Sequence, residues 1–429
     1  MHDARELIAL GPEAVRQLAR RNHPLDLDAL EAAARRRTAA EEQVSRLRAQ
    51  LKAASRAGKG ARTGAPSEEE RAAARALRDR VQDAETEARA AGTELSQWLQ
   101  TIPNLPLDRV PDGQSEKEAV EIRRGGPPIV AAEGDVPHHA DIGERLGLFD
   151  AARSTRLSGA RFHVSRGPGA RLERALAAFL LDLHTEEHGY TEYAVPFLVN
   201  RETMTGTGQL PKFEEDLFAT RVGDRELFLI PTAEVPLTNL VAGEVLTSAE
   251  LPLAFTAHTP CFRSEAGSYG RDTRGLLRLH QFEKVELVRV CALEDAPSQF
   301  DLMVGHVEKC LQKLELSYRV VLLPAGDMGF SARMTHDLEV WLPGSGAFRE
   351  ISSVSDCGAF QARRAGIRHR SGTGRNVPAA TLNGSALPIG RTVAALLEQG
   401  ARPDGSVVLP DALVPYTGFR TILPGGRTA

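Results

Sequence analysis

The fold is decided by a stretch that begins Cys261-Phe262-Arg263-Ser264-Glu265 and continues through Arg271 and Arg274 to His280-Gln281-Phe282 and Glu286. It predicts a strand, a charged loop that contains glycine, and a second strand whose apolar residues alternate. Because side chains two apart on a strand point the same way, we expect Arg263 and Glu265 to share one face. A guanidinium binds phosphate through a bidentate fork, so this face suits a nucleotide. The stretch predicts a nucleotide triphosphate site without a glycine-rich phosphate loop.

Composition limits the class of protein. The chain has 429 residues, enough for two or three domains, and its net charge of −4 does not indicate nucleic-acid binding by the surface as a whole. Its four cysteines, at positions 261, 291, 310 and 357, form no CxxC pair, so we expect no disulfide framework or thiol-rich metal site. The first residues lack the apolar core of a signal peptide, and no apolar run is long enough to cross a bilayer. We therefore expect a soluble cytoplasmic protein with no membrane segment.

The first hundred residues predict a long helical hairpin. Residues 27–57 and 67–99 are rich in Ala, Arg, Glu and Leu, and a glycine-rich turn at residues 58–66 separates them. In the second segment, apolar residues alternate spacings of four and three, as in a coiled coil: Leu77, Val81, Ala84, Ala88, Ala91, Leu95 and Trp98. We expect two antiparallel helices that form an arm over residues 27–99.

The first helix of this arm is basic. Its cations include Arg35, Arg36, Arg46, Lys52 and Arg56. Such a run is either a solvated helix face or a track for a phosphate backbone, whose affinity rises with each neutralised phosphate. Charge alone leaves both interpretations open.

Proline residues after the arm indicate a domain boundary at about residue 115, so we predict domains at 1–115 and 116–429. In the second domain, residues 171–188 have helical apolar spacing, and residues 384–399 predict a glycine-containing turn that leads into a helix. Strand-like segments occur at residues 190–199, 227–230, 254–262, 281–290, 318–323, 337–342 and 347–353. Because no βαβ rhythm is present, the pattern predicts an antiparallel α+β domain.

Several longer strings carry a family resemblance. They are Leu198–Met204, Thr207–Phe213, Pro231–Asn239, Phe262–Gly275, Arg349–Ser353 and Thr381–Ser385. In these strings, and in the order of its helical arm and antiparallel sheet, the chain resembles seryl-tRNA synthetases, which are class II aminoacyl-tRNA synthetases. The resemblance extends over nearly the whole chain.

The resemblance implies roles for individual residues. Pro196 corresponds to the first class II motif at a homodimer interface, Arg263, Ser264 and Glu265 to the second, and Gly390 and Arg391 to the third. It implies that Arg263 contacts the α-phosphate of ATP and Arg391 the γ-phosphate, as the two catalytic residues. It also implies a serine pocket of Thr232, Ala233, Glu234, Arg263, Glu286 and Ser385, further ATP contacts from Glu350, Ile351, Ser352 and Ser353, and Mg²⁺ ligands Glu350 and Ser353.

The implied activity is the attachment of L-serine to tRNA(Ser) through a seryl-adenylate, with ATP and Mg²⁺, and to the selenocysteine tRNA where the host has one. Family members use the arm to hold tRNA, which favours the phosphate-track interpretation of Arg35, Arg36, Arg46, Lys52 and Arg56. The resemblance implies a homodimer.

The chain departs from the family at a few positions. The family usually has glycine at Ala386, cysteine and asparagine at Val354 and Asp356, and a small residue at Pro388. We expect the Ala386 methyl to crowd the serine pocket or reshape its turn, because glycine permits backbone angles that alanine does not. The departures motivate an alternative, a specialised paralogue that resists a serine-adenylate-like inhibitor or supplies activated serine to a carrier protein or biosynthetic pathway. Neutral drift in a housekeeping enzyme explains them equally well, and the retained site residues oppose a catalytically dead regulatory paralogue.

One motif points elsewhere. His184-Thr185-Glu186-Glu187-His188 matches the H-x-x-E-H pattern of some zinc proteases. A five-residue match is a weak signal, and we interpret it as part of an ordinary helix.

Overall fold

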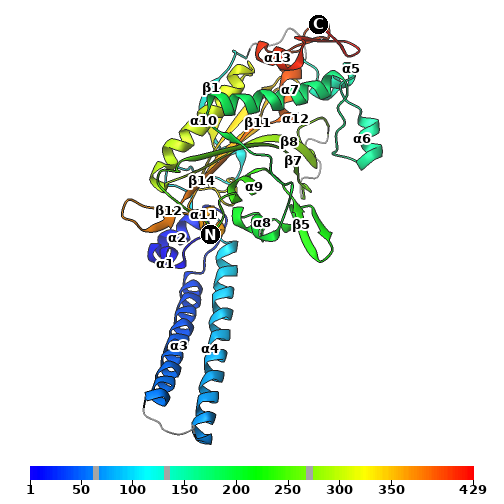
Figure 1. Ribbon diagram of the computed structural model, residues 1–429. Helices are drawn as coiled ribbons and strands as arrows, with labels where there is room; N and C mark the ends of the chain where they lie inside the picture. Colours follow the sequence, from blue (N-terminus) through cyan, green and yellow to red (C-terminus); the bar gives the residue numbers. More distant parts are fainter. Residues whose placement is uncertain (61–66, 130–135, 267–273) are drawn as a thin grey trace. The chain divides into compact units, whose positions relative to one another are not determined.

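A computed structural model describes residues 1–60, 67–129, 136–266 and 274–429 (Figure 1). Arg271 and residues 61–66 of the predicted turn lie outside the described residues. The chain divides into two compact units, Met1–Pro103 and Asn104–Ala429. The predicted domain boundary lies near residue 115, whereas the contacts of the second unit already begin at Asn104: Asn104 N donates to Phe330 O at 2.9 Å and Leu107 N to Arg333 O at 2.9 Å.

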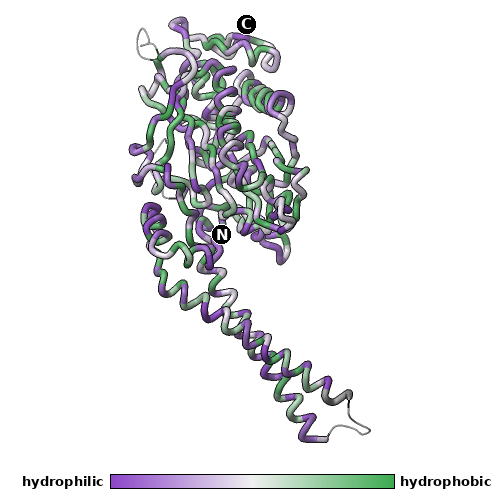
Figure 2. The backbone as a smooth tube through the Cα atoms, turned by 90° about the vertical axis from the view of Figure 1, so that its left-hand side faces the viewer, coloured by the Kyte–Doolittle hydropathy of each residue, from purple (hydrophilic) through white to green (hydrophobic). Residues whose placement is uncertain are grey.

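The first unit consists of helices α1 (Ala4–Leu10), α2 (Pro12–Ala19), α3 (Leu27–Gly60) and α4 (Glu68–Thr101). A capping box begins α4, in which Ser67 Oγ accepts from Glu70 N and Glu70 Oε2 accepts from Ser67 N. Apolar and polar residues alternate along both long helices (Figure 2). The buried seam of the hairpin contains Val44, Leu47, Val81 and Ala84, which confirms the predicted coiled coil.

The second unit is built on an eight-stranded sheet in the order β1-β9-β10-β11-β14-β8-β7-β2 among the described residues. All neighbouring pairs are antiparallel except β2 with β7. The strands are Val120–Gly125 (β1), Thr191–Glu192 (β2), Leu253–Phe262 (β7), Gln281–Cys291 (β8), Tyr318–Leu322 (β9), Met334–Leu342 (β10), Ala347–Gly358 (β11) and Ala380–Pro388 (β14). The predicted α+β class is confirmed.

Helices and three small sheets surround this sheet. The helices are α5 (His139–Arg145), α6 (Ala151–Ser158), α7 (Pro168–Asp182), α8 (Arg201–Thr207), α9 (Glu234–Asn239), α10 (Ala296–Lys313), α11 (Phe360–Ala365), α12 (Ile389–Gln399) and α13 (Val414–Thr417). The small sheets comprise β3 (Leu198–Val199), β5 (Arg225–Leu229) and β4 (Ala219–Val222); β13 (Asn376–Pro378), β12 (Arg368–Arg370) and β6 (Val245–Leu246); and β15 (Val407–Val408), β16 (Thr421–Leu423) and β17 (Arg427–Thr428).

Side chains alternate between the two faces of the sheet along β8, and this alternation determines which face carries a site. Val285 and Leu287 enter the main core, together with apolar residues of α7, α10 and α12. Lys284 and Glu286 therefore point to the opposite face. On β14, which pairs Ser385 with Glu286, Leu382 and Ala386 belong to the same core and Asn383 and Ser385 to the opposite face.

Three sequence predictions need correction. Residues 384–388 are not a turn but the end of the central strand β14. Residues 190–199 form two separate two-residue strands, β2 and β3. The helix predicted to reach residue 188 ends as α7 at Asp182 and continues as one π-helical turn, Leu183–Glu187.

Within the described residues, no helix has the length and apolar character that a membrane crossing requires.

Candidate active site

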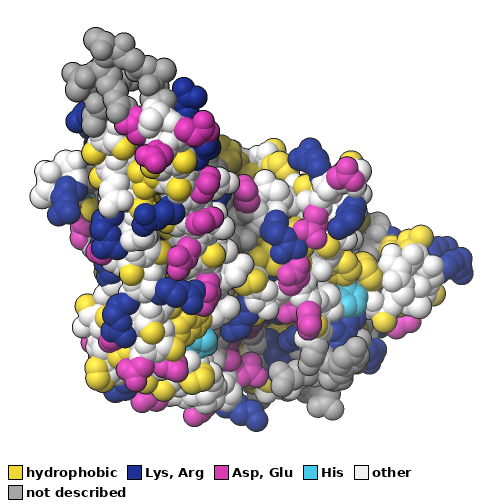
Figure 3. Space-filling model, turned by 90° about the horizontal axis from the view of Figure 1, so that it is seen from below, with side chains coloured by type: hydrophobic (Ala, Val, Ile, Leu, Met, Phe, Trp, Pro, Cys, Tyr) yellow, Lys and Arg dark blue, Asp and Glu magenta, His cyan; other side chains and the backbone are white. Residues whose placement is uncertain are grey.

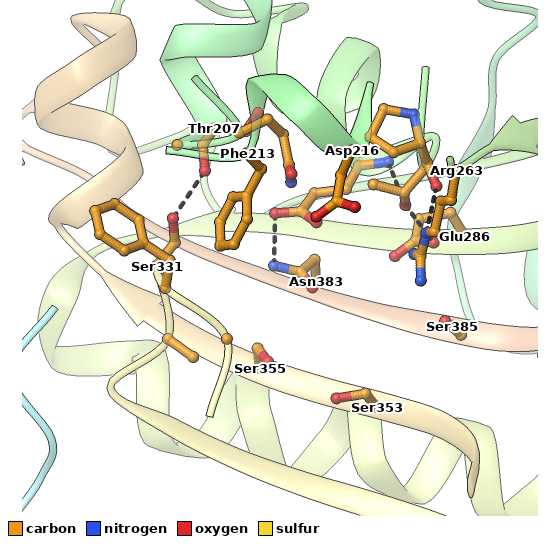
Figure 4. A pocket seen from close by; sticks show the side chains of 18 of the residues that line it. Thr207, Phe213, Asp216, Arg263, Glu286, Ser331, Ser353, Ser355, Asn383 and Ser385 are labelled. Atoms are coloured by element: carbon orange, nitrogen blue, oxygen red, sulfur yellow. Dashed lines mark hydrogen bonds between the residues drawn. The ribbon is translucent and has the colours of Figure 1, made fainter. Parts of the chain in front are cut away.

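A cavity of about 680 Å³ opens on the polar face of the central sheet (Figure 4). Its walls come from β8, β11 and β14, from the residues that follow β7, from the segment before α9, and from residues 207–217 and 329–332. Predicted residues that line it are Thr232, Glu234, Arg263, Glu265, Glu286, Glu350, Ser353 and Ser385. The structure thus brings together eight residues that are widely separated in sequence.

A buried ion pair lies at one wall of this cavity. Lys284 Nζ contacts Glu286 Oε2, and the two side chains are 7% and 2% exposed. Thr232 Oγ1 donates to Glu286 Oε2 at 3.0 Å and accepts from Lys284 Nζ at 3.0 Å. Burial raises the pKa of Glu286, and Lys284 acts against that rise. The group offers a carboxylate, a hydroxyl and an ammonium to a small polar ligand.

A second carboxylate, Glu234, stands near the first. Its Oε1 accepts from Gln361 Nε2 at 2.6 Å and from Asn383 Nδ2 at 3.0 Å. Burial, and then repulsion from Glu286, raise the pKa of Glu234 to about 7. Two carboxylates held close together attract a cation, so this end of the cavity suits an ammonium group.

Arg263 and Glu265 both line the cavity, but not as neighbours on a strand. The strand β7 ends at Phe262, and Glu265 has φ of 54°, a left-handed backbone. Arg263 Nε donates to Pro231 O at 3.2 Å, and its guanidinium lies 5.2 Å from the centre of the Phe282 ring. Glu265 accepts from Arg278 Nη1 at 2.6 Å. The predicted shared strand face is wrong because the chain turns immediately after Phe262.

A smaller cavity of about 60 Å³ adjoins the first and is lined by Arg263, Glu350 and Arg391 among others. Arg391 Nη1 donates to Glu350 O at 2.7 Å and lies 3.2 Å from Glu350 Oε2. Its charge is the main cause of a lowered pKa of Glu350. The two arginines therefore line a common polar region, as binding of a polyphosphate requires.

Comparison with known proteins decides the family. Sequence models match residues 1–106 as "Seryl-tRNA synthetase N-terminal domain" and residues 213–400 as "tRNA synthetase class II core domain (G, H, P, S and T)". The chain is 71% identical to serine–tRNA ligase 2 of Streptomyces avermitilis over 429 residues, 100% of both chains. The chain belongs to the seryl-tRNA synthetase family.

Other relatives agree. A serine–tRNA ligase of Acidithiobacillus ferrooxidans is 49% identical over 419 residues, 97% of this chain and 98% of its own. The crystal structure of seryl-tRNA synthetase from Pyrococcus horikoshii complexed with ATP matches with a TM-score of 0.89 at 33% identity, covering 99% of this chain and 100% of that one.

Some residues expected from the seryl-tRNA synthetase resemblance do not line either cavity. Ala233 and Ile351 are fully buried in hydrophobic cores. Ser352 Oγ donates to Ser385 O at 2.6 Å, and Ser264 Oγ donates to Glu215 O at 2.9 Å. These four side chains thus face the core or the neighbouring backbone, and the contacts of these residues with ATP or serine stay predictions.

Two of the four departures from the family pattern lie on the apolar face of the sheet, whereas Pro388 lines the smaller cavity and Asp356 pairs with Arg333 at 2.9 Å. Ala386 and Val354 are fully buried in the main core. Ala386 does not have a positive φ; the left-handed backbone falls on Leu387, at φ of 86°, beside an irregularity between Ser385 and Pro388. The expectation that the Ala386 methyl crowds the serine pocket is therefore wrong.

Sequence reasoning missed several polar residues that line the cavity, among them Lys284, Asn383 and Arg278. Lys284 had a detectable signal, because it precedes Glu286 by two positions on a strand and therefore shares its face. Asn383 had the same relation to Ser385. Arg278 follows the loop and gave no comparable signal.

Of the H-x-x-E-H residues, His184 to Glu187 lie in the π-helical turn after α7 and His188 follows it. His184 Nδ1 lies 3.0 Å from His188 Nδ1, and His184 Nε2 lies 3.2 Å from Cys310 Sγ. Both nitrogens of the buried His184 are therefore engaged by side chains of the protein. This cluster does not line the cavity.

The basic residues of the arm differ in their surroundings. Arg35 pairs with Glu31 at 2.9 Å, and Arg36 contacts Glu94 across the hairpin. Arg46 Nη2 donates to the neutral Gln43 at 2.8 Å. Lys52 and Arg56 are exposed, and no carboxylate among the described residues pairs with them. Basic and acidic side chains are interspersed on the face in Figure 3. The unneutralised charge thus concentrates in the C-terminal half of α3.

Proposed function

We propose that this chain attaches L-serine to tRNA(Ser) in two steps, through a seryl-adenylate made from serine and ATP. The observation that supports this proposal most directly is the buried group of Thr232, Lys284 and Glu286, with Glu234 beside it, in a cavity that Arg263 also lines. In the first step the serine carboxylate attacks the α-phosphorus of ATP and pyrophosphate leaves. In the second, a hydroxyl of the terminal tRNA adenosine takes the seryl group and AMP leaves.

The first step needs little proton transfer, so positioning and charge stabilisation supply most of the catalysis. We assign Arg263 to the α-phosphate and Arg391 to the γ-phosphate, as the catalytic residues. Glu234 and Glu286 receive the serine ammonium, and Thr232 with Glu286 receives the hydroxyl. Alanine lacks the hydroxyl that this buried polar group binds, so a site built around that hydroxyl rejects alanine strongly.

Mg²⁺ fits the oxygen donors beside the smaller cavity. Glu350 and Ser353 supply a carboxylate and a hydroxyl, the ligand types that a hard cation prefers. The neighbouring Asp337, opposite Ser353 in the β10–β11 register, has a buried Oδ1 without a hydrogen-bond partner among the described residues. Burial, and then the neighbouring Glu350, raise the pKa of Asp337 well above its usual range. When bound, Mg²⁺ supplies charge neutralisation for the triphosphate.

For tRNA binding we propose the arm, with Arg46, Lys52 and Arg56 contributing more than the paired Arg35 and Arg36. Exposed cations along a helical hairpin can contact several phosphates of a tRNA backbone. We also propose that the chain acts in the cytoplasm, together with its substrates. Charging of a selenocysteine tRNA stays a prediction.

A homodimer is supported by the apolar surface around the first class II motif. Tyr193, Phe197 and Leu198 are 36%, 43% and 41% exposed, next to Pro196 and the short edge strand β2. Exposed apolar clusters at a sheet edge are typical of subunit contacts. No observation favours the specialised paralogue over the tRNA-charging enzyme.

The proposal is tested by ATP–pyrophosphate exchange with serine, alanine and threonine. We expect exchange with serine alone, and its loss in Glu286→Gln. Equal exchange with alanine would show that the buried polar group does not select the serine hydroxyl and would overturn the assignment.

A further inference from the structure

A fully buried histidine outside the active-site cavities links three elements. His139, at the start of α5, contacts Glu398 near the end of α12: its Nδ1 lies 2.8 Å from Glu398 Oε1, and its backbone N donates to the same oxygen at 3.0 Å. The other oxygen, Glu398 Oε2, accepts from Gly344 N in the β10–β11 turn at 2.8 Å. Both side chains have no exposed surface.

The hydrogen bonds fix the position of the imidazole proton. Leu276 N donates to His139 Nε2 at 3.1 Å, so Nε2 must offer its lone pair. The proton of the neutral ring then lies on Nδ1 and is donated to Glu398. Burial works to raise the pKa of Glu398, but hydrogen bonds from His139 and Gly344 outweigh it and keep that pKa below its ordinary value.

The backbone that His139 holds also positions an active-site arginine. Leu277 O, one residue after the anchored Leu276 N, accepts from Arg391 Nε at 3.1 Å. Leu276 and Leu277 line the smaller cavity together with Arg391. Arg391 and Glu398 are seven residues apart on α12, almost two full turns, so they lie on the same side of that helix. The helix thus contacts residues 276–277 directly through Arg391 and indirectly through Glu398 and His139.

Packing leaves little freedom at this anchor. A Cβ at Gly275 would lie 2.1 Å from His139 Nε2, and φ there is 78°. The preceding Arg274 also contacts Asp141 of α5. Two consecutive residues are therefore held against α5 immediately before the cavity wall begins.

The ligand atoms of His138, His139 and Glu398 lie within 4.8 Å of one another, close enough to hold a metal ion. Both ring nitrogens of His139 and both oxygens of Glu398 are already engaged in hydrogen bonds. His138 Nδ1 accepts from Ala140 N at 3.2 Å. These bonds favour a hydrogen-bonded structural cluster over a metal site.

We propose that the His139–Glu398 pair is a positioning unit for ATP: it holds the backbone at Leu276–Leu277 and thereby orients Arg391 toward the phosphates. This inference rests on the proposed adenylation activity and adds residues to it that do not touch the substrates. Loss of the unit weakens ATP binding and leaves serine binding unchanged, because the serine pocket lies on β8 and β14 and before α9.

Two conservative substitutions separate the two bonds of the ring. His139→Gln places an amide oxygen about where Nε2 was and keeps the acceptor for Leu276 N, whereas His139→Asn keeps a donor to Glu398 and loses that acceptor. The Kd of ATP, from calorimetry on the full chain, and the KM values for ATP and serine in exchange are measured. We expect His139→Asn to raise the Kd and KM for ATP about 3- to 10-fold and His139→Gln to raise them less than about twofold. The KM for serine stays constant in both.

His184→Asn is the matched control, because it removes another buried imidazole from the same unit at a distance from the cavities. It should leave both KM values unchanged. Equal effects of the two His139 variants on ATP, or parallel changes in the KM for ATP and serine, would overturn the positioning role. If His139→Asn does not fold, Glu398→Gln takes its place: it sets a donor against an N–H, a repulsion that His139→Gln does not create, so the KM for ATP should rise while the KM for serine stays constant. Exchange by the unaltered chain is measured first: its absence counts against the proposed function, and ATP calorimetry then still tests the pair.

Discussion

The Lys284–Glu286 pair makes the strongest energetic prediction of the active site. Replacing Lys284 by Met keeps the approximate length and removes the cation beside a carboxylate that is 2% exposed. Breaking a buried ion pair from one side typically costs about 3–5 kcal/mol, because one charge remains without a partner. We therefore expect Lys284→Met to lower the free energy of unfolding by about that amount at about pH 8.

The pH dependence gives this prediction its direction. Burial already raises the pKa of Glu286, and removal of Lys284, which lowers it, raises that pKa further. A carboxyl whose folded pKa exceeds its unfolded pKa stabilises the fold at low pH and loses that contribution as pH rises. The free energy of unfolding that Lys284→Met loses relative to the unaltered chain should thus be small near about pH 5 and grow toward about pH 8. The double variant Lys284→Met/Glu286→Gln removes both charges. It should be about 2 kcal/mol or more stable than the single variant Lys284→Met.

Urea unfolding measures these energies. The chain has two tryptophans, Trp98 in the first unit and Trp341 in the second, so a Trp98→Phe background reports on the catalytic unit alone. Lys309→Met, an exposed lysine on α10, is the matched control and should change stability by less than about 0.5 kcal/mol. The reasoning is refuted if the Lys284→Met deficit is the same at both pH values, or if the single effects add to the double within about 0.5 kcal/mol.

The remaining predictions concern other residues. Because the pKa of Glu234 is about 7, the KM for serine should rise as pH falls below about 7, and Glu234→Gln should remove this step from the pH profile; an unchanged profile would contradict the ammonium contact. Lys52→Ala with Arg56→Ala should raise the KM for tRNA about 3- to 10-fold and leave exchange unchanged, whereas Arg35→Ala, already paired with Glu31, should have a smaller effect; charging kinetics at two salt concentrations test this. Ala386→Gly should lower stability by about 1 kcal/mol without changing the KM for serine or the affinity of a serine-adenylate analogue, and tighter binding of the analogue would show that the methyl does reach the pocket.

The arm and most sheet strands were predictable because their patterns are local. The heptad spacing of Val81 and Ala84 reports directly on the buried seam of the hairpin. The strand β14 was missed because Asn383 and Gly384 are poor strand formers, and its place in the sheet depends on pairing with β8 and β11. Non-local pairing leaves no periodic signal in the segment itself.

The active site was predictable in membership and less so in geometry. The roles that the family resemblance implies include those of Thr232, Glu286 and Arg391, all of which line the cavities. They did not indicate on which face of the sheet Ala386 lies, because that depends on strand β14, which the sequence did not predict. The anchoring role of His139 had no local signal either, because its partner Glu398 lies 259 positions away.

The most direct test of the account is charging of purified tRNA(Ser) with labelled serine by the full chain. We predict a plateau of about one serine per tRNA, dependent on ATP and Mg²⁺, and a slower approach to it in the Lys52→Ala/Arg56→Ala variant. Serine-dependent exchange without any charging of tRNA would contradict the account and would direct the search to a carrier protein as the acceptor.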